Sequence, residues 1–167
     1  MKRICAWCGQ EMPVKSEAGD GVTHGICDRC ADGLRGHVGI PLQDFLDRFP
    51  FPVLATDDDV AIVAANPRAL AMLGRPAEEV LSRRGGEVFD CAESHLPEGC
   101  GRGIHCSGCA IRRAVFETHA TGEPRLRVPA TLRKGDLDAP ETIALILTTA
   151  MKDGLVMLKL ERADQGE

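Results

Sequence analysis

The order of apolar and polar positions separates a cysteine-rich start from a longer segment with regular periodicity. Apolar residues follow a helical spacing over residues 42–49 and then form two short runs, 53–56 and 60–64. Three aspartates at 57–59 lie between these runs. A turn-forming cluster between two apolar runs predicts a β-hairpin that follows a short amphipathic helix.

Helix signals follow the hairpin. Asn66 and Pro67 favour a helix start, because asparagine caps free backbone N–H groups and proline fits the first helical position. Gly74 is expected to end this helix, and a short helix is expected after Pro76. A longer helix is predicted over residues 109–119, with one apolar face made by Ile111, Ala114, Val115 and Thr118.

Three strands are predicted to close the segment. Residues 126–132 alternate, and Pro129 restricts that strand to a sheet edge. Residues 142–149 are almost continuously apolar and predict a central strand. Asp153 and Gly154 then form a turn into residues 155–160. The predicted order is two strands, several short helices and three strands.

Composition and charge limit the classes of function. The chain has 167 residues, of which 44% are hydrophobic and 27% charged, enough for one core and a small accessory unit. A formal charge of −5 argues against a general nucleic-acid or anionic-membrane surface. No signal peptide or membrane-spanning stretch is expected. We therefore expect a cytoplasmic protein whose eight cysteines stay reduced and serve metal binding.

Two C-x2-C pairs occupy the start of the chain. They are separated by eighteen residues and comprise Cys5, Cys8, Cys27 and Cys30. This spacing is typical of structural zinc sites, in which four thiolates close a tetrahedral ion. Residues 1–37 are therefore predicted to form a small zinc-ribbon or knuckle unit, with a turn at Gly9. The alternatives are two reduced, packed C-x2-C turns, or His24 as a substitute ligand.

A second group of four cysteines lies in a glycine-rich segment, residues 91–109: Cys91, Cys100, Cys106 and Cys109. Four thiolates bind zinc or an iron–sulfur cluster, so the identity of the metal stays open. A thiol–disulfide oxidoreductase using Cys106 and Cys109 is a second interpretation, because a helix N-terminus lowers a thiol pKa. Cysteines packed as small hydrophobes are a third. His95 or His105 in place of one cysteine is a further alternative.

Several motifs resemble known families. Ile-Cys-Ala-Trp-Cys with His-Gly-Ile-Cys-Asp-Arg-Cys resembles a short cysteine-pair module of bacterial signalling proteins. Pro-Val-Leu-Ala-Thr-Asp, then Ile-Val-Ala-Ala-Asn-Pro and Met-Leu-Gly-Arg-Pro-Ala-Glu-Glu-Val, resemble a bacterial PAS domain over residues 42–163. Gly-Cys-Gly-Arg with His-Cys-Ser-Gly-Cys looks like a cysteine-rich insertion of some PAS sensors. The resemblance implies an α+β fold, with a five-stranded antiparallel sheet and helices on one face.

The resemblance also implies a role in sensing and dimerisation. We expect a non-enzymatic signalling module whose PAS domain carries a four-cysteine metal site and passes redox or ligand state to a protein partner or a second copy. The alternatives are the oxidoreductase and a purely structural, zinc-stabilised dimerisation module. No nucleic-acid or membrane partner is expected.

Overall fold

The computed structural model describes residues 1–14, 21–35 and 41–163. The chain divides into two compact units, Met1–Gly39 and Ile40–Glu167. The domain bounds expected from sequence, 1–37 and 42–163, stay predictions, and His37 lies outside the described residues.

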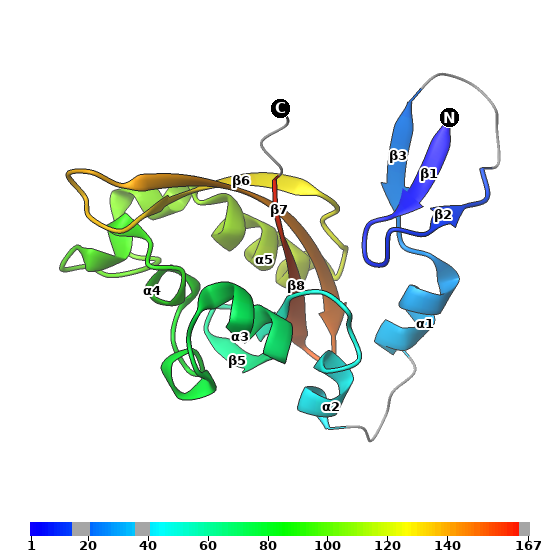
Figure 1. Ribbon diagram of the computed structural model, residues 1–167, viewed down its shortest axis with the longest axis horizontal. Helices are drawn as coiled ribbons and strands as arrows, with labels where there is room; N and C mark the ends of the chain where they lie inside the picture. The colour runs from blue at the N-terminus through cyan, green and yellow to red at the C-terminus, as the bar shows by residue number, and fades with distance from the viewer. Residues whose placement is uncertain (15–20, 36–40, 164–167) are drawn as a thin grey trace. The chain divides into compact units, whose positions relative to one another are not determined.

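The small unit is a three-stranded sheet with one helix (Figure 1). Its elements are β1 (Lys2–Cys5), β2 (Glu11–Met12), β3 (Val22–Gly25) and α1 (Asp28–Arg35). Strand β1 is central, antiparallel to β2 and parallel to β3. Gly9 has a φ of 75°, so the predicted tight turn after Cys8 uses the left-handed region that glycine adopts without steric cost. The strands and the helix of this unit were not predicted.

The large unit contains a five-stranded antiparallel sheet. Its strands are β4 (Val53–Thr56), β5 (Ile62–Ala65), β6 (Val128–Lys134), β7 (Glu141–Lys152) and β8 (Leu155–Arg162). They lie in the order β5-β4-β8-β7-β6. Pro129 is in β6 at the sheet edge, and β7 lies between β8 and β6, as the sequence predicts. The α+β fold with a five-stranded antiparallel sheet is confirmed.

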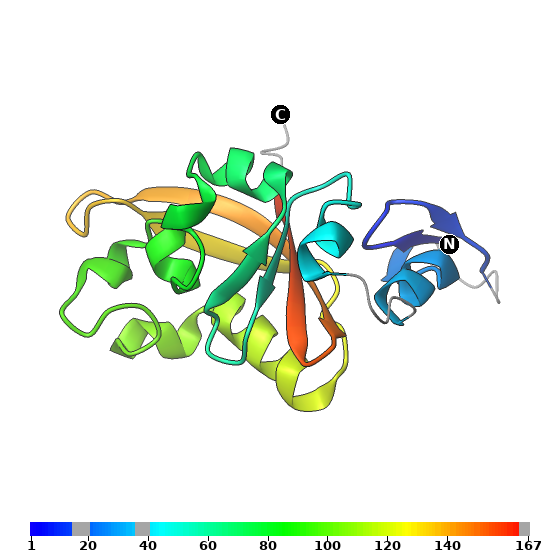
Figure 2. The ribbon, with the colours of Figure 1, turned by 90° about the horizontal axis from the view of Figure 1, so that it is seen from below.

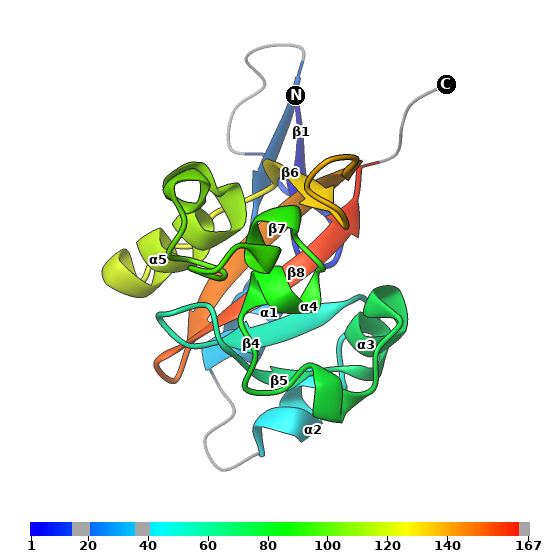
Figure 3. The same cartoon turned by 90° about the vertical axis from the view of Figure 1, so that its left-hand side faces the viewer.

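One short helix, α2, precedes β4, and the other helices connect β5 to β6 (Figure 3). They are α2 (Leu42–Leu46), α3 (Pro67–Leu73), α4 (Gly85–Val88) and the 3₁₀ helices η1 (Ala77–Glu79), η2 (Ala92–His95) and η3 (Ile104–Gly108). The longest, α5 (Ala110–Thr121), packs along β6, β7 and β8 (Figure 2). Its buried residues are those predicted from periodicity, Ile111, Ala114, Val115 and Thr118.

Asn66 ties the helical region to the sheet. Its Oδ1 accepts from the N–H of Ala69 at 2.9 Å, which caps α3, and from the N–H of Val53 at 3.1 Å. Its Nδ2 donates to the carbonyl of Phe51 at 2.8 Å. The predicted cap is confirmed, and Gly74 ends α3 with a φ of 65°.

The core lies between one face of the sheet and the helices α3, α4 and α5. Apolar side chains at alternate positions of the strands point into it, including Leu145 and Leu147 of β7 and Leu158 and Leu160 of β8. On the opposite face, the Lys159 ammonium lies 4.5 Å from the Phe51 ring. Within the described residues, every helix is too short or too polar to span a bilayer.

Candidate metal centres

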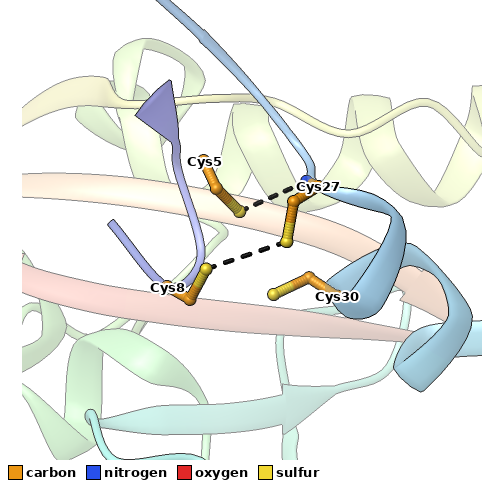
Figure 4. Close-up of side chains that lie close together, drawn as sticks. All are labelled: Cys5, Cys8, Cys27 and Cys30. Carbon is orange, nitrogen blue, oxygen red and sulfur yellow. Dashed lines mark hydrogen bonds between the residues drawn. The ribbon is translucent and has the colours of Figure 1, made fainter. Parts of the chain in front are cut away.

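The first four cysteines converge on one point (Figure 4). Cys5 ends β1, Cys8 follows in the turn, and Cys27 and Cys30 flank the start of α1. The four Sγ atoms all lie within 4.8 Å of one another, and those of Cys8 and Cys27 are 3.8 Å apart. Because Zn–S bonds are about 2.3 Å, sulfurs around a tetrahedral zinc are separated by about 3.8 Å. The site therefore fits a single tetrahedral ion.

The strand pairing explains how two distant pairs meet. β1 and β3 are parallel, and Cys5 lies opposite Gly25, so Cys27 follows directly beside the first pair. The backbone N–H of Cys27 donates to Cys5 Sγ at 3.4 Å. His24 is in β3 and does not belong to the group of converging ligands found in the described part of the chain.

Backbone donors prepare one thiol for metal binding. Burial raises the pKa of Cys5, but the N–H groups of Cys8, Cys27 and Trp7 outweigh it and lower this pKa from 9.0 to about 7. The pKa of Cys30 is raised, first by burial and then by its thiol neighbours. A bound cation would offset the repulsion among these sulfurs, as metal binding to thiolates requires.

The second group comes from four separate places in the large unit. Cys91 precedes η2, Cys100 lies in the following loop, Cys106 is in η3, and Cys109 caps the start of α5. All four line one mainly apolar cavity of about 70 Å³. The fold thus places around one cavity the four cysteines that the sequence predicts to act as a set.

Two backbone N–H groups point at sulfurs of this second group. Gly86 donates to Cys100 Sγ and Gly101 donates to Cys106 Sγ, each at 3.2 Å. Gly101 belongs to the glycine-rich segment that carries the cysteines. Gly86 was missed, because it precedes the segment and only the fold brings α4 against the loop. The two consecutive glycines, Gly85 and Gly86, were the sequence signal that could have indicated a close backbone contact here.

The second group is more widely spaced than the first. Among the residues that the structure describes, these four cysteines do not form a group whose ligand atoms all lie within 4.8 Å of one another. A single tetrahedral ion requires sulfurs about 3.8 Å apart. The four thiols therefore surround a cavity and do not meet at one ion-sized point.

The second group is partly buried and has charged side chains beside it. Burial raises the pKa of Cys91 and of Cys100, and the nearby cysteines raise both further. Arg112 lines the cavity, as does Glu93, which is 9% exposed and pairs with Arg133 at 2.6 Å. Two other arginines close to the cysteines in sequence, Arg102 and Arg113, are exposed and do not line this cavity.

Three further side chains lie close to the cysteine segment. Arg84, which the sequence did not single out, pairs with Asp59 and donates to the carbonyl of Cys100 at 2.7 Å. His105 lines the cavity. His95 lies outside it, with Nε2 2.9 Å from Asp90 Oδ1.

Residues 42–105 match the PAS domain family. These residues belong to a PAS domain. This confirms the family that the sequence motifs indicated, and the match includes Cys91 and Cys100 but ends before Cys106. We call the unit Ile40–Glu167 the PAS unit. PAS domains are generally sensory, non-catalytic modules of signalling proteins, and they commonly mediate protein interactions.

Solved structures of PAS type are similar at low identity. A LOV protein of Rhodobacter sphaeroides is 16% identical with a TM-score of 0.48, over 74% of this chain and 65% of that one, so the chain spans about two thirds of its length. The PAS domain of nitrogen regulation protein NR(II) of Vibrio parahaemolyticus is 12% identical with a TM-score of 0.46, over 74% and 100%.

A domain of a sensory box histidine kinase/response regulator of Geobacter sulfurreducens is 17% identical with a TM-score of 0.47, over 71% and 88%. No curated protein matches the chain. The family match alone carries the identification.

Proposed function

We propose that this chain is a non-enzymatic, cytoplasmic sensor module in which the PAS unit carries a metal centre on Cys91, Cys100, Cys106 and Cys109. The observation that supports it is the cavity inside the PAS unit lined by all four thiols. Cys5, Cys8, Cys27 and Cys30 would hold a structural zinc, because four thiolates leave no open coordination position.

The spacing favours an iron–sulfur cluster over a second zinc. A four-iron cluster is larger than one ion, so its cysteine sulfurs stand further apart than the tetrahedral zinc spacing allows. The second group is wider than the first in this same chain. Amide hydrogen bonds to sulfur, such as those from Gly86 and Gly101, stabilise and tune such clusters. Zinc remains the alternative occupant.

The geometry is less suited to thiol–disulfide exchange. An exchanging thiol has to be reached by a second protein or a small thiol. Cys106 is only 9% exposed, and its Sγ already accepts from Gly101. All eight cysteines are free, which suits a reducing compartment.

The four cysteines would connect the centre to the sheet. Cys109 is the N-cap of α5, which packs on β6, β7 and β8, and Cys91 forms a β-bridge with Lys134 at the end of β6. Loss or oxidation of the centre would release these anchors together. The altered packing would then reach a protein partner or a second copy, for which residues 42–49 are the proposed contact; the helix predicted over this range ends at Leu46, as α2.

Metal counting and visible absorption of anaerobically purified full-length protein test this proposal. We expect a brown sample with about one zinc and four iron per chain, Cys100→Ser losing only the iron and Cys27→Ser only the zinc. Two zincs without colour would leave a structural protein. Little metal with a mobile Cys106–Cys109 disulfide would favour the oxidoreductase.

The signalling step needs its own measurement. Sedimentation of the metal-loaded and metal-depleted forms should show different self-association, or a different affinity for a bound partner. If the metal-loaded wild type, the metal-depleted wild type and Cys100→Ser all associate identically, the second centre does not control assembly. The sensor role is then wrong.

A further inference from the structure

A second cavity lies on the core-facing side of the PAS sheet, between α3, α4 and the ends of three strands. Its volume is about 190 Å³. The floor is apolar and includes Val88, Phe89, Leu132 and Leu145, all members of the buried core. Because these walls belong to the core, the cavity is held open by the same packing that stabilises the domain.

Three cations surround this apolar floor: Arg75 after α3, Lys134 at the end of β6 and Arg162 at the end of β8. Side chains alternate between the faces of a strand. Lys134 follows Leu132 by two residues and Arg162 follows Leu160 by two, so both cations are on the core-facing side. At positions where the alternation predicts apolar residues, the chain carries positive charge beside a cavity.

The positive charge of this rim is not offset by the residues that line it. In the described part of the chain, no ion pair is found for Arg75, Lys134 or Arg162, whereas seven other lysine and arginine side chains there pair with aspartate or glutamate. The lining includes one carboxylate, Asp90, which already contacts His95 at 2.9 Å. Glu141 lies opposite Lys134 in the register of β6 and β7, but its side chain is exposed and does not line the cavity.

We propose that this cavity binds a small organic anion: a carboxylate on a compact apolar body of about six to nine non-hydrogen atoms, a size set by the roughly 30 Å³ that one water occupies. Guanidinium groups bind carboxylates through paired hydrogen bonds, and Lys134 adds a point charge. The core residues of the floor would take the apolar body, as in ligand pockets generally. The ligand would also relieve repulsion among the three cations.

The anion site adjoins the cavity of the second cysteine group. Phe89 and Leu132 line both cavities, so one layer of side chains separates them. The backbones of Lys134 and Cys91 form an isolated β-bridge, and the N–H of Gly135 donates to the carbonyl of Asp90 at 2.8 Å. A bound anion would therefore stabilise the loop that begins the cysteine segment. The anion site itself does not depend on the proposed metal centre.

Calorimetric titration of the full chain with matched probes tests the proposal. Benzoate and 3-methylbutanoate supply a carboxylate on an apolar body, benzamide and 3-methylbutanamide keep the body without charge, and sulfate supplies charge without the body. We expect one saturable site for at least one carboxylate, with its amide and sulfate each at least tenfold weaker, since charged hydrogen bonds contribute about 1.5–3 kcal/mol.

Variants locate the site. Lys134→Gln and Arg162→Gln should each weaken carboxylate binding about tenfold while the melting temperature of the ligand-free protein stays constant or rises. Arg113→Gln, an exposed cation of α5 outside the cavity, is the matched control and should bind as the wild type does. Failure of both carboxylates to bind, equal binding of amide or sulfate, or unchanged affinity in both rim variants would overturn the proposal.

Discussion

The backbone N–H of Gly86 donates a hydrogen bond to Cys100 Sγ at 3.2 Å, although the two residues are 14 positions apart. A Cβ atom at position 86 would lie 2.6 Å from this sulfur and 3.0 Å from Cys100 Cβ. Real Cβ contacts do not approach this closely, so position 86 has to lack a side chain for Cys100 to sit where it does.

Gly86→Ala is therefore expected to displace Cys100 and empty the second cysteine group of metal. The first group lies in the other unit and should keep its zinc. Iron and zinc counts per chain measure both effects. Gly108→Ala is the control, because an added Cβ meets nothing within 4 Å there. Equal iron content in Gly86→Ala and the wild type would contradict the role of this contact.

Asn66 should be a major determinant of stability. It is 1% exposed and uses its side chain to bind the backbone of β4, α3 and the segment before β4. Asn66→Ala leaves these buried groups without partners and removes the α3 cap, a loss of about 3 kcal/mol in unfolding free energy. Urea denaturation measures it. Asn66→Ser keeps an acceptor for the cap and should lose distinctly less; equal losses would argue against the cap.

Alkaline pH should destabilise the metal-free, reduced protein. Burial raises the pKa of Cys91 and Cys100 above the 9.0 of an unfolded thiol. A group with a raised pKa contributes stability below the unfolded value and loses it as pH rises through the folded value. The unfolding free energy should therefore fall between pH 8 and pH 10. Cys91→Ala/Cys100→Ala should show a shallower fall, and an identical pH profile would contradict the assignment.

Removing metal from the first group should unfold the small unit alone. Among its described residues, few apolar side chains are buried, so metal binding has to supply much of the folding free energy, about 10–16 kcal/mol for structural zinc peptides. Cys27→Ser, or a chelator, should collapse the amide NMR dispersion of residues 1–35 while PAS-unit signals persist. Val22→Ala, at a position 54% exposed, is the control. Retained dispersion in Cys27→Ser would show that the unit folds without metal.

Local pattern was sufficient for much of the fold. The Asn66-Pro67 start and the Gly74 end of α3 were predicted because capping depends on a few adjacent residues. The buried face of α5 was predicted because a period near 3.6 places Ile111 and Val115 on one side. The strands of the small unit were missed because they are two to four residues long and depend on partners distant in sequence.

The sequence by itself determined the elements of the PAS fold and the division of eight cysteines into two sets, because both are written in short-range spacing. Only the tertiary structure decided how far apart the sulfurs of each set lie. The first set meets at one point because β1 and β3 pair in parallel, whereas the second surrounds a cavity because α4, the loop and α5 meet there. The cation-rimmed cavity was likewise undetectable in sequence, since Arg75, Lys134 and Arg162 are neighbours only after the sheet has formed.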